Sequence, residues 1–229
     1  MAALHEPPRV PYRDRTDAGR TLAGYLKEYE NRADTVIAAI PRGGVVVGVE
    51  IANELRLPMT VFLLRKLGMP GQEELSLGAI ASGGSKIINA DLVRSLRVPQ
   101  DVLDSVAFRE SQELLRREQL YARGRPPVDL RGKLVILVDD GIATGAGARL
   151  AVQAVRKQGA RKVILAVPVG PRNTMEQLRQ EADEVVCPAE PTNFHAVGEW
   201  YEDFRQVSDC EVCQLLDSLS EKTPRLQSA

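Results

Sequence analysis

Two adjacent carboxylates, Asp139 and Asp140, follow directly after a run of apolar residues at positions 135–138. A continuous apolar run predicts a strand that is buried on both faces, as in parallel sheets. A loop of small residues follows at 141–147, and an amphipathic helix is expected after it. Backbone amides at the start of a helix bind phosphate, whereas paired acids suit sugar hydroxyls or a divalent cation. The stretch therefore predicts a site for a ribose phosphate.

Other loop motifs fit this stretch less well. A P-loop needs Gly-Lys followed by Ser or Thr, and residues 141–147 contain no lysine. A dinucleotide fingerprint needs a small residue at the position of Leu150. An ordinary strand–turn–helix, whose acids only cap the helix, remains as the alternative.

A second strand end is expected beside these acids. Residues 36–40 predict a buried strand, followed by the turn Pro41-Arg42-Gly43-Gly44 and a helix from residue 45 to residue 55. Ligands of open α/β sheets bind outside the carboxyl ends of the strands. This turn is thus a candidate anion site, with a plain tight turn and a solvated arginine as the alternative.

A third strand is predicted at residues 59–68, with Arg65 and Lys66 at its end. Two cations at a third strand terminus would complement a highly charged phosphate ligand. A solvated strand exit is the alternative interpretation. The following residues, 68–86, are rich in glycine and weakly periodic, so no buried element is expected there apart from a hairpin around residues 82–85.

Together these motifs resemble the 5-phosphoribosyl-1-pyrophosphate (PRPP) signature of type I phosphoribosyltransferases. The resemblance covers about residues 36–187. With RDRTDAG near the start and FHAVGEWYEDF in the tail, the chain is similar to a group of predicted bacterial phosphoribosyltransferases of unassigned substrate. It implies an α/β fold with a mainly parallel central sheet flanked by helices, a flexible loop and a C-terminal hood. It also implies a homodimer, which is usual in the family. The expected small-molecule partners are PRPP and a nitrogenous acceptor.

The resemblance assigns roles residue by residue. Asp139, Asp140 and Lys66 are the expected catalytic residues. The two acids would contact the ribose hydroxyls and, through ribose or water, the expected cofactor Mg2+. The 5-phosphate is expected to contact Gly141, Ile142, Ala143, Thr144 and Gly145. Pyrophosphate is expected to contact Arg42, Gly43, Gly44, Arg65 and Lys66.

The acceptor is not fixed by the sequence. Members of the family that use 6-oxopurines carry an Asp at the position of Ala143, so hypoxanthine and guanine are disfavoured. The tail gathers aromatic residues that are expected either to line an acceptor pocket or to pin the tail to the core. These acceptor-pocket candidates are Phe194, His195, Trp200 and Tyr201.

The expected organisation is a core over residues 1–190 and a hood or tail over residues 191–229. Residues 1–16 are expected to extend over the surface, and residues 68–86 to form the mobile loop. A last helix is predicted at about 209–219, with Cys210 and Cys213 facing inward.

Composition narrows the function classes. The net charge is −1, which argues against binding nucleic acid or a membrane surface. Three cysteines and the lack of a long apolar run suit a cytoplasmic protein. We therefore expect a phosphoribosyltransferase, because a non-catalytic PRPP or nucleotide sensor could dispense with the pyrophosphate side. The sensor and a phosphoribosyl hydrolase remain as alternatives.

Overall fold

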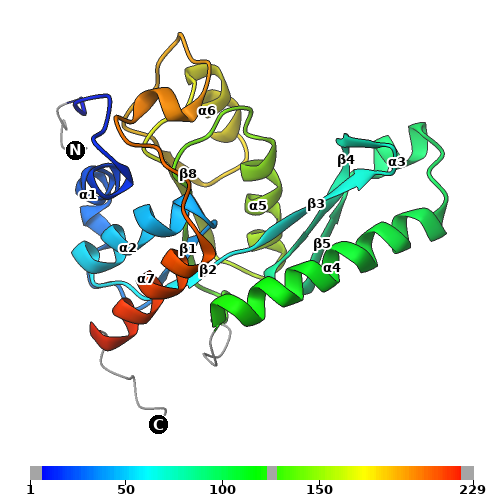
Figure 1. The fold of residues 1–229 in the computed structure, drawn as a ribbon, viewed down its shortest axis with the longest axis horizontal. Helices are drawn as coiled ribbons and strands as arrows, with labels where there is room; N and C mark the ends of the chain where they lie inside the picture. Colours follow the sequence, from blue (N-terminus) through cyan, green and yellow to red (C-terminus); the bar gives the residue numbers. More distant parts are fainter. Residues whose placement is uncertain (1–6, 123–127, 223–229) are drawn as a thin grey trace.

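The computed structural model describes residues 7–122 and 128–222. In these residues the chain forms an α/β core, from which an arm projects to one side (Figure 1). The core contains a five-stranded parallel sheet in the order β2-β1-β6-β7-β8. Its strands are β1 (Thr35–Ala39), β2 (Met59–Val61), β6 (Leu134–Val138), β7 (Lys162–Ala166) and β8 (Glu184–Val186). The predicted fold class, with its mainly parallel central sheet, is confirmed.

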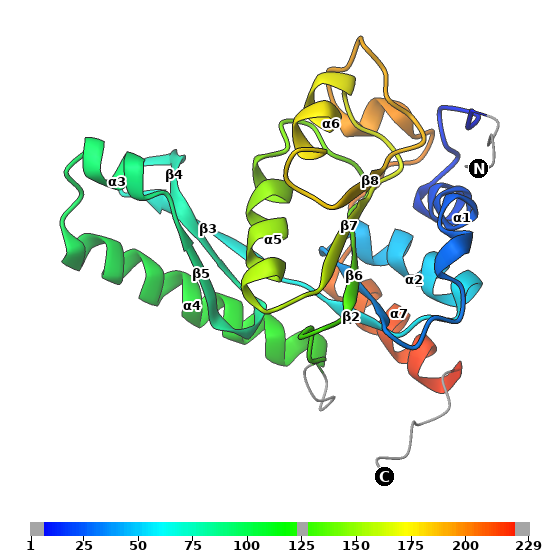
Figure 2. The same cartoon turned by 180° about the vertical axis from the view of Figure 1, so that it is seen from behind.

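Helices cover both faces of this sheet (Figures 1 and 2). One face carries α1 (Arg15–Tyr25), the short η1 (Lys27–Tyr29) and α2 (Gly43–Leu55), and α7 (Asp209–Lys222) packs on α2. The other face carries α5 (Ala146–Lys157) and α6 (Arg172–Leu178). Alternate residues of each strand point to opposite faces. Val135 and Leu137 therefore pack with α5, whereas Ile136 and Val138 pack with α1 and α2. This two-sided burial explains the continuous apolar runs.

The parallel register brings the carboxyl ends of the strands together. Ala39 of β1 pairs with Val138 of β6, and Val138 pairs with Ala166 of β7. Val61 of β2 pairs with Ala39. The loops that follow these strands therefore leave the sheet from one edge. The predicted ligand site requires this, because its residues were expected at the ends of three neighbouring strands.

The arm is built from residues 64–122. Its antiparallel sheet, in the order β3-β4-β5, consists of β3 (Leu64–Met69), β4 (Gln72–Ala81) and β5 (Ser85–Ile88), with η2 (Ser82–Gly84) between β4 and β5. Helices α3 (Ala90–Ser95) and α4 (Gln100–Ala122) complete the arm. The hairpin around residues 82–85 is confirmed. The expectation for the other residues of 68–86 needs one correction, because the first strand of the hairpin begins already at Gln72 and pairs with β3. Leu77 and Ile80 of this strand are buried in one cluster with Leu103 of α4.

The strand predicted at residues 59–68 is in fact two strands in two sheets. The amide of Phe62 donates to the carbonyl of Ala39 in the core sheet (2.8 Å), whereas the amide of Leu63 donates to the Ser82 hydroxyl in the arm (2.9 Å). Phe62 itself is buried in the core. The chain changes sheets at this point, so that Arg65 and Lys66 lie in the arm.

Residues 7–11 lie at the surface, as predicted, but Tyr12 is 1% exposed and anchors the N-terminal segment. The amide of Tyr12 donates to the carbonyl of Trp200 (2.8 Å), and its carbonyl accepts from the amide of Glu202 (2.7 Å). The Tyr12 hydroxyl donates to the carbonyl of Pro168 (3.0 Å). The beginning of the described chain is therefore joined to the C-terminal segment, which includes η3 (Val197–Trp200).

The remaining expectations concern the ends of the chain. In α7, Cys213 is buried, but Cys210 is exposed, so only one of the two faces inward. Residues 1–6 and 223–229 of the predicted extension and tail lie outside the described residues. None of the helices in the described part of the chain has the length and apolar character needed to span a membrane.

Candidate functional site

The two acids stand at the carboxyl end of β6, in the centre of the sheet. The amide of Asp140 donates to Oδ1 of Asp139 (2.9 Å). Burial, and next the charge of Asp140, raise the pKa of Asp139 well above its usual range. The pair therefore resists carrying two negative charges unless donors or cations compensate them.

One cation already compensates Asp140. Arg15 of α1 donates from Nε to Oδ2 of Asp140 at 2.6 Å, and its side chain is only 10% exposed. The same guanidinium donates to the carbonyl of Arg205 (2.8 Å) and lies 3.8 Å from the centre of the Phe204 ring. The site thus includes a residue from each end of the chain.

The glycine turn after β1 packs directly against the acids. A Cβ atom on Gly43 would lie 1.8 Å from Oδ2 of Asp140 and 2.7 Å from Nε of Arg15. On Gly44 it would lie 2.8 Å from Cα of Asp139. No side chain fits at either position, so the backbone of this turn lies against the acids, as predicted.

Two helix N-termini meet at this edge without side-chain caps. Helix α2 begins after Arg42 and helix α5 begins after Gly145, which has a φ of 76°. Neither N-cap side chain bonds to its helix, and neither first turn contains an acid. Uncapped helix N-termini attract anions through their free amides and their macrodipole. The two helix N-termini are therefore candidate anion sites close to the acids.

The predicted 5-phosphate loop is only partly available. The side chain of Ile142 is buried, and its amide donates to the carbonyl of Val169 (3.0 Å), so this amide serves the fold. Ala143 and Thr144 are exposed. The carbonyl of Ala143 accepts from the Thr174 hydroxyl at 3.0 Å, which fixes the loop against α6. The free amides are thus expected in the second half of the loop.

Arg42 lies beside the glycine turn, but its side chain points to the C-terminal segment. Its Nη1 atom lies 3.9 Å from Oδ1 of Asp209 at the start of α7, and 44% of the side chain is exposed. Asp209 also accepts from the hydroxyl of Tyr121 at the end of α4 (2.6 Å). Arg42 therefore has the exposure needed to reorient toward a ligand.

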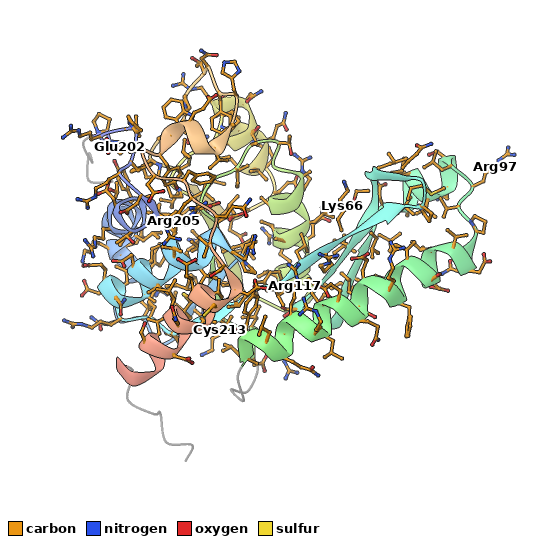
Figure 3. The ribbon with its side chains drawn as sticks, viewed as in Figure 1. Lys66, Arg97, Arg117, Glu202, Arg205 and Cys213 are labelled. Atoms are coloured by element: carbon orange, nitrogen blue, oxygen red, sulfur yellow. The ribbon has the colours of Figure 1, made fainter. Side chains whose placement is uncertain are left out.

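Arg65 and Lys66 do not act as the pair that was predicted. Arg65 donates from Nε (3.0 Å) and Nη2 (2.6 Å) to Oε2 of Glu110 on α4, so its charge is compensated within the arm. Neighbouring residues of a strand point to opposite faces. Lys66 is exposed and projects from the side of the arm sheet opposite α4 (Figure 3). The structure therefore separates Arg65 from the acids.

The pairing of Arg65 predicts a structural role that can be measured. Glu110 is 12% exposed, and Arg65→Met would leave its Oε2 without a donor, although Arg109 still donates to Oε1 (3.2 Å). The free energy of unfolding is therefore expected to fall by about 1–3 kcal/mol, the usual cost of a buried polar atom that is left unpaired. Arg94→Met is the control, because the Arg94–Asp91 pair is exposed and such pairs are worth about 0–1 kcal/mol. Urea unfolding of the two variants measures the difference; equal effects would contradict this role.

The aromatic residues of the tail mainly pack with one another. Tyr201 is buried beside Tyr12, and its hydroxyl donates to the carbonyl of Asp140. Burial raises the pKa of this hydroxyl. The rings of Phe194 and Trp200 are parallel, with centres 6.3 Å apart. Tyr201 thus fixes the tail to the acids rather than facing an acceptor, which is the packing alternative.

Two members of the predicted acceptor pocket remain candidates. His195 is exposed. The Nε1 atom of Trp200 is buried and has no hydrogen-bond partner among the described residues. An unpaired buried N–H costs free energy unless a ligand accepts from it. Because this atom is covered by its neighbours, an acceptor could reach it only if the tail shifted.

The acids do not form a metal site of their own. No cluster of three or more metal-ligating side chains occurs among the described residues. Mg2+ is commonly held by one or two carboxylates together with substrate phosphates and water. Asp139 and Asp140 fit this second arrangement, in which the ligand supplies most of the oxygen atoms.

Sequence reasoning missed Arg15, Tyr12 and the backbone of Arg205. Arg15 lies 125 positions from Asp140 in the sequence, so no local pattern connects them. The available signal was the RDRTDAG segment, which the resemblance noted without assigning it a role. A charged residue on the first turn of a helix is otherwise interpreted as solvated.

The phosphoribosyl transferase domain family matches residues 13–205. A Mycobacterium tuberculosis protein named "Putative phosphoribosyl transferase" is 46% identical over 204 residues, covering 89% of this chain and 46% of that protein. The chain thus spans about half the length of the curated relatives that it matches. The crystal structure of TT1426 from Thermus thermophilus has a TM-score of 0.80 and 39% identity, covering 91% of this chain and 98% of that chain.

The family match begins two residues before Arg15 and ends at Arg205. It therefore includes both residues of the hydrogen bond that connects α1 to the C-terminal segment beside Asp140. The fold is that of the type I phosphoribosyltransferases. This chain belongs to the phosphoribosyltransferase family.

Proposed function

We propose that this chain transfers the 5-phosphoribosyl group of PRPP to a nitrogenous acceptor and releases pyrophosphate. The observation that carries the proposal is the pair of uncapped helix N-termini, at α2 and α5, close to Asp139 and Asp140. PRPP has the matching groups, with a phosphate at each end and a diol between them.

Each part of PRPP would then have its own partner. The 5-phosphate would bind the first turn of α5, with the exposed Thr144 hydroxyl beside it. The pyrophosphate would bind the backbone of Gly43 and Gly44, with Lys66 reaching it from the arm. Arg42 would join it by leaving Asp209. Arg65 would first have to leave Glu110, so we assign it no contact.

Catalysis by these residues would be positional and electrostatic. The bond from C1 of the ribose to pyrophosphate breaks ahead of attack, so positive charge develops on the ribose. Asp139 and Asp140 would hold the 2- and 3-hydroxyls beside that charge, and the α2 amides would stabilise the leaving oxygen. Asp139 and Asp140 would hold Mg2+ through ribose or water, and the ion would supply charge neutralisation for the pyrophosphate.

The acceptor would enter beside the tail. Ala143 cannot accept or relay a proton, so a base with that need is disfavoured. Nε1 of Trp200 is buried, so this atom does not select the acceptor. Heterocyclic and amine nitrogen compounds are the substrate class to test.

The first experiment is a calorimetric titration of PRPP, with and without Mg2+. We expect binding that strengthens with Mg2+, and weaker binding of ribose 5-phosphate and of pyrophosphate separately, because the two helix ends form separate subsites. The absence of PRPP binding under both conditions would refute the proposal.

A second experiment separates catalysis from sensing. PRPP is supplied with a panel of nucleobases and amines, and pyrophosphate release is followed. Release that depends on one acceptor indicates a transferase, whereas release without any acceptor indicates a hydrolase. Binding without release across the panel would indicate the alternative function, a non-catalytic PRPP-binding regulator.

A further inference from the structure

Arg15 lies outside the predicted PRPP motifs, but it contacts both Asp140 and the C-terminal segment. We propose that Arg15 is a positioning residue that orients Asp140 for ribose and couples PRPP binding to the placement of the C-terminal segment. The inference rests on the proposed function, because it concerns the same ribose site. It adds a residue from outside the PRPP motifs and a connection to the tail.

Arg15 holds two partners with one guanidinium, the carboxylate of Asp140 and the carbonyl of Arg205. Nε donates to Oδ2 of Asp140 at 2.6 Å, and Nη1 donates to the carbonyl of Arg205 at 2.8 Å. The guanidinium is planar and delocalised, and it also lies over the Phe204 ring at 3.8 Å. A lysine could keep the charge but not this set of fixed contacts.

The carboxylate of Asp140 has little freedom under this contact. Gly43 covers the same oxygen so closely that a methyl group would lie 1.8 Å from it. The Tyr201 hydroxyl holds the backbone carbonyl of Asp140 from the other side. The hydrogen bonds among described residues thus occupy Oδ2 and the carbonyl, which leaves Oδ1 as the oxygen for a sugar hydroxyl.

The same contacts hold the tail in place. Tyr201 and Phe204 flank Arg15, and Arg205 accepts its hydrogen bond. A ligand that draws Asp140 toward its hydroxyl would therefore also pull on residues 201–205. Conversely, a loosened tail would free Asp140 from its orientation. Binding and tail placement are thus expected to change together.

The chain provides its own reporter of the tail. Trp200 is the only tryptophan in the sequence, and it immediately precedes Tyr201. Its indole N–H is buried. Acrylamide quenching of tryptophan fluorescence therefore measures how closely the tail is held.

The variants are Arg15→Met, which removes the charge, and Arg15→Lys, which keeps it. Arg20→Met is the matched control, because Arg20 lies on the same helix and also pairs with a carboxylate, Glu50, but is 58% exposed. Each protein is measured by calorimetry with PRPP and Mg2+, and by acrylamide quenching with and without PRPP.

We expect Arg15→Met to weaken PRPP binding about ten- to hundredfold, the equivalent of one charge-assisted hydrogen bond. Quenching of Trp200 should rise in the free variant, and the PRPP-dependent change in quenching should be lost. Arg15→Lys should recover part of the affinity but not the quenching change. Arg20→Met should resemble the wild type.

The comparison of the two variants provides a readout that a purely structural role would not give. A folded Arg15→Lys that regains PRPP affinity without the quenching change would separate the charge of Arg15 from the fixed contacts of its guanidinium.

The outcomes distinguish the two proposals. If the wild type does not bind PRPP, the proposed function is refuted, and this inference with it. If the wild type binds and a folded Arg15→Met binds within twofold of it, only the inference is overturned. Loss of affinity without any change in quenching would overturn the coupling. If Arg15→Met does not fold, Arg15→Lys decides, and full wild-type behaviour in that variant would overturn the inference.

Discussion

Asp139→Asn is expected to give a protein that is inactive but more stable than the wild type at neutral pH. The folded pKa of Asp139 is raised by burial and by Asp140, so its stabilising contribution is complete below the unfolded pKa, about 4. That contribution is lost as the pH rises through the folded pKa. Asparagine removes the free-energy cost of holding a buried charge beside Asp140, and its side-chain oxygen can still accept from the amide of Asp140.

Asp139→Asn is expected to raise the free energy of unfolding and Tm at pH 8, and to leave both close to the wild-type values at pH 4. Thermal unfolding across this pH range measures the change. PRPP-dependent turnover should fall by at least about a hundredfold, because a charge that stabilises the transition state is lost. A variant that keeps wild-type turnover would refute the role of Asp139.

Asp140→Asn provides the contrast. It should be equally inactive but less stable than the wild type by about 3 kcal/mol, because Arg15 is left buried without its carboxylate. Opposite stability changes at two adjacent acids would be difficult to explain by general disruption of the loop. Two changes of the same sign would contradict the proposed charge arrangement.

Gly43→Ala is expected to abolish PRPP binding. The added methyl group would lie 1.8 Å from Oδ2 of Asp140, against a normal limit of about 3 Å, so Asp140, Arg15 or the turn must move. The backbone that would receive pyrophosphate is then displaced, and a displacement of about 1 Å can cost about a hundredfold in activity. We expect at least this loss in PRPP affinity, with a loss of stability of about 1–3 kcal/mol.

Gly24→Ala is the control for this substitution. A Cβ atom at Gly24 meets nothing within 4 Å, and the residue lies inside α1. Replacing a helical glycine by alanine stabilises a protein by up to about 1 kcal/mol. Calorimetry with PRPP and circular dichroism on both variants provide the comparison. Wild-type affinity in Gly43→Ala would show that the turn is not part of the site.

The central sheet could be predicted from the sequence because its signals are local. Continuous apolar runs in β1 and β6 show burial on both faces, and the glycine turns that follow mark the carboxyl ends. The parallel register then places Asp139 beside Gly44 without further information. The motif residues are thus close together because the strands that carry them are neighbours.

The assembly of the arm and the role of Arg15 could not be predicted, for two different reasons. The arm strands are separated by tight turns with glycines of positive φ, such as Gly71 and Gly83. A segment with so many glycines has the sequence pattern of a loop. The burial of the arm strands depends on α4, which begins only at Gln100. Arg15 depends on a contact across the whole fold, for which a single sequence carries no periodic signal.

The hydrogen bond from Arg15 to the carbonyl of Arg205 spans 190 positions of a 229-residue chain. During synthesis, the guanidinium of Arg15 must therefore wait until residue 205 has been made before it meets this acceptor. Contacts of such long range are entropically costly and form late. Completion of the ribose site would then be among the last events of folding, so that a nascent or truncated chain lacks an assembled ligand site.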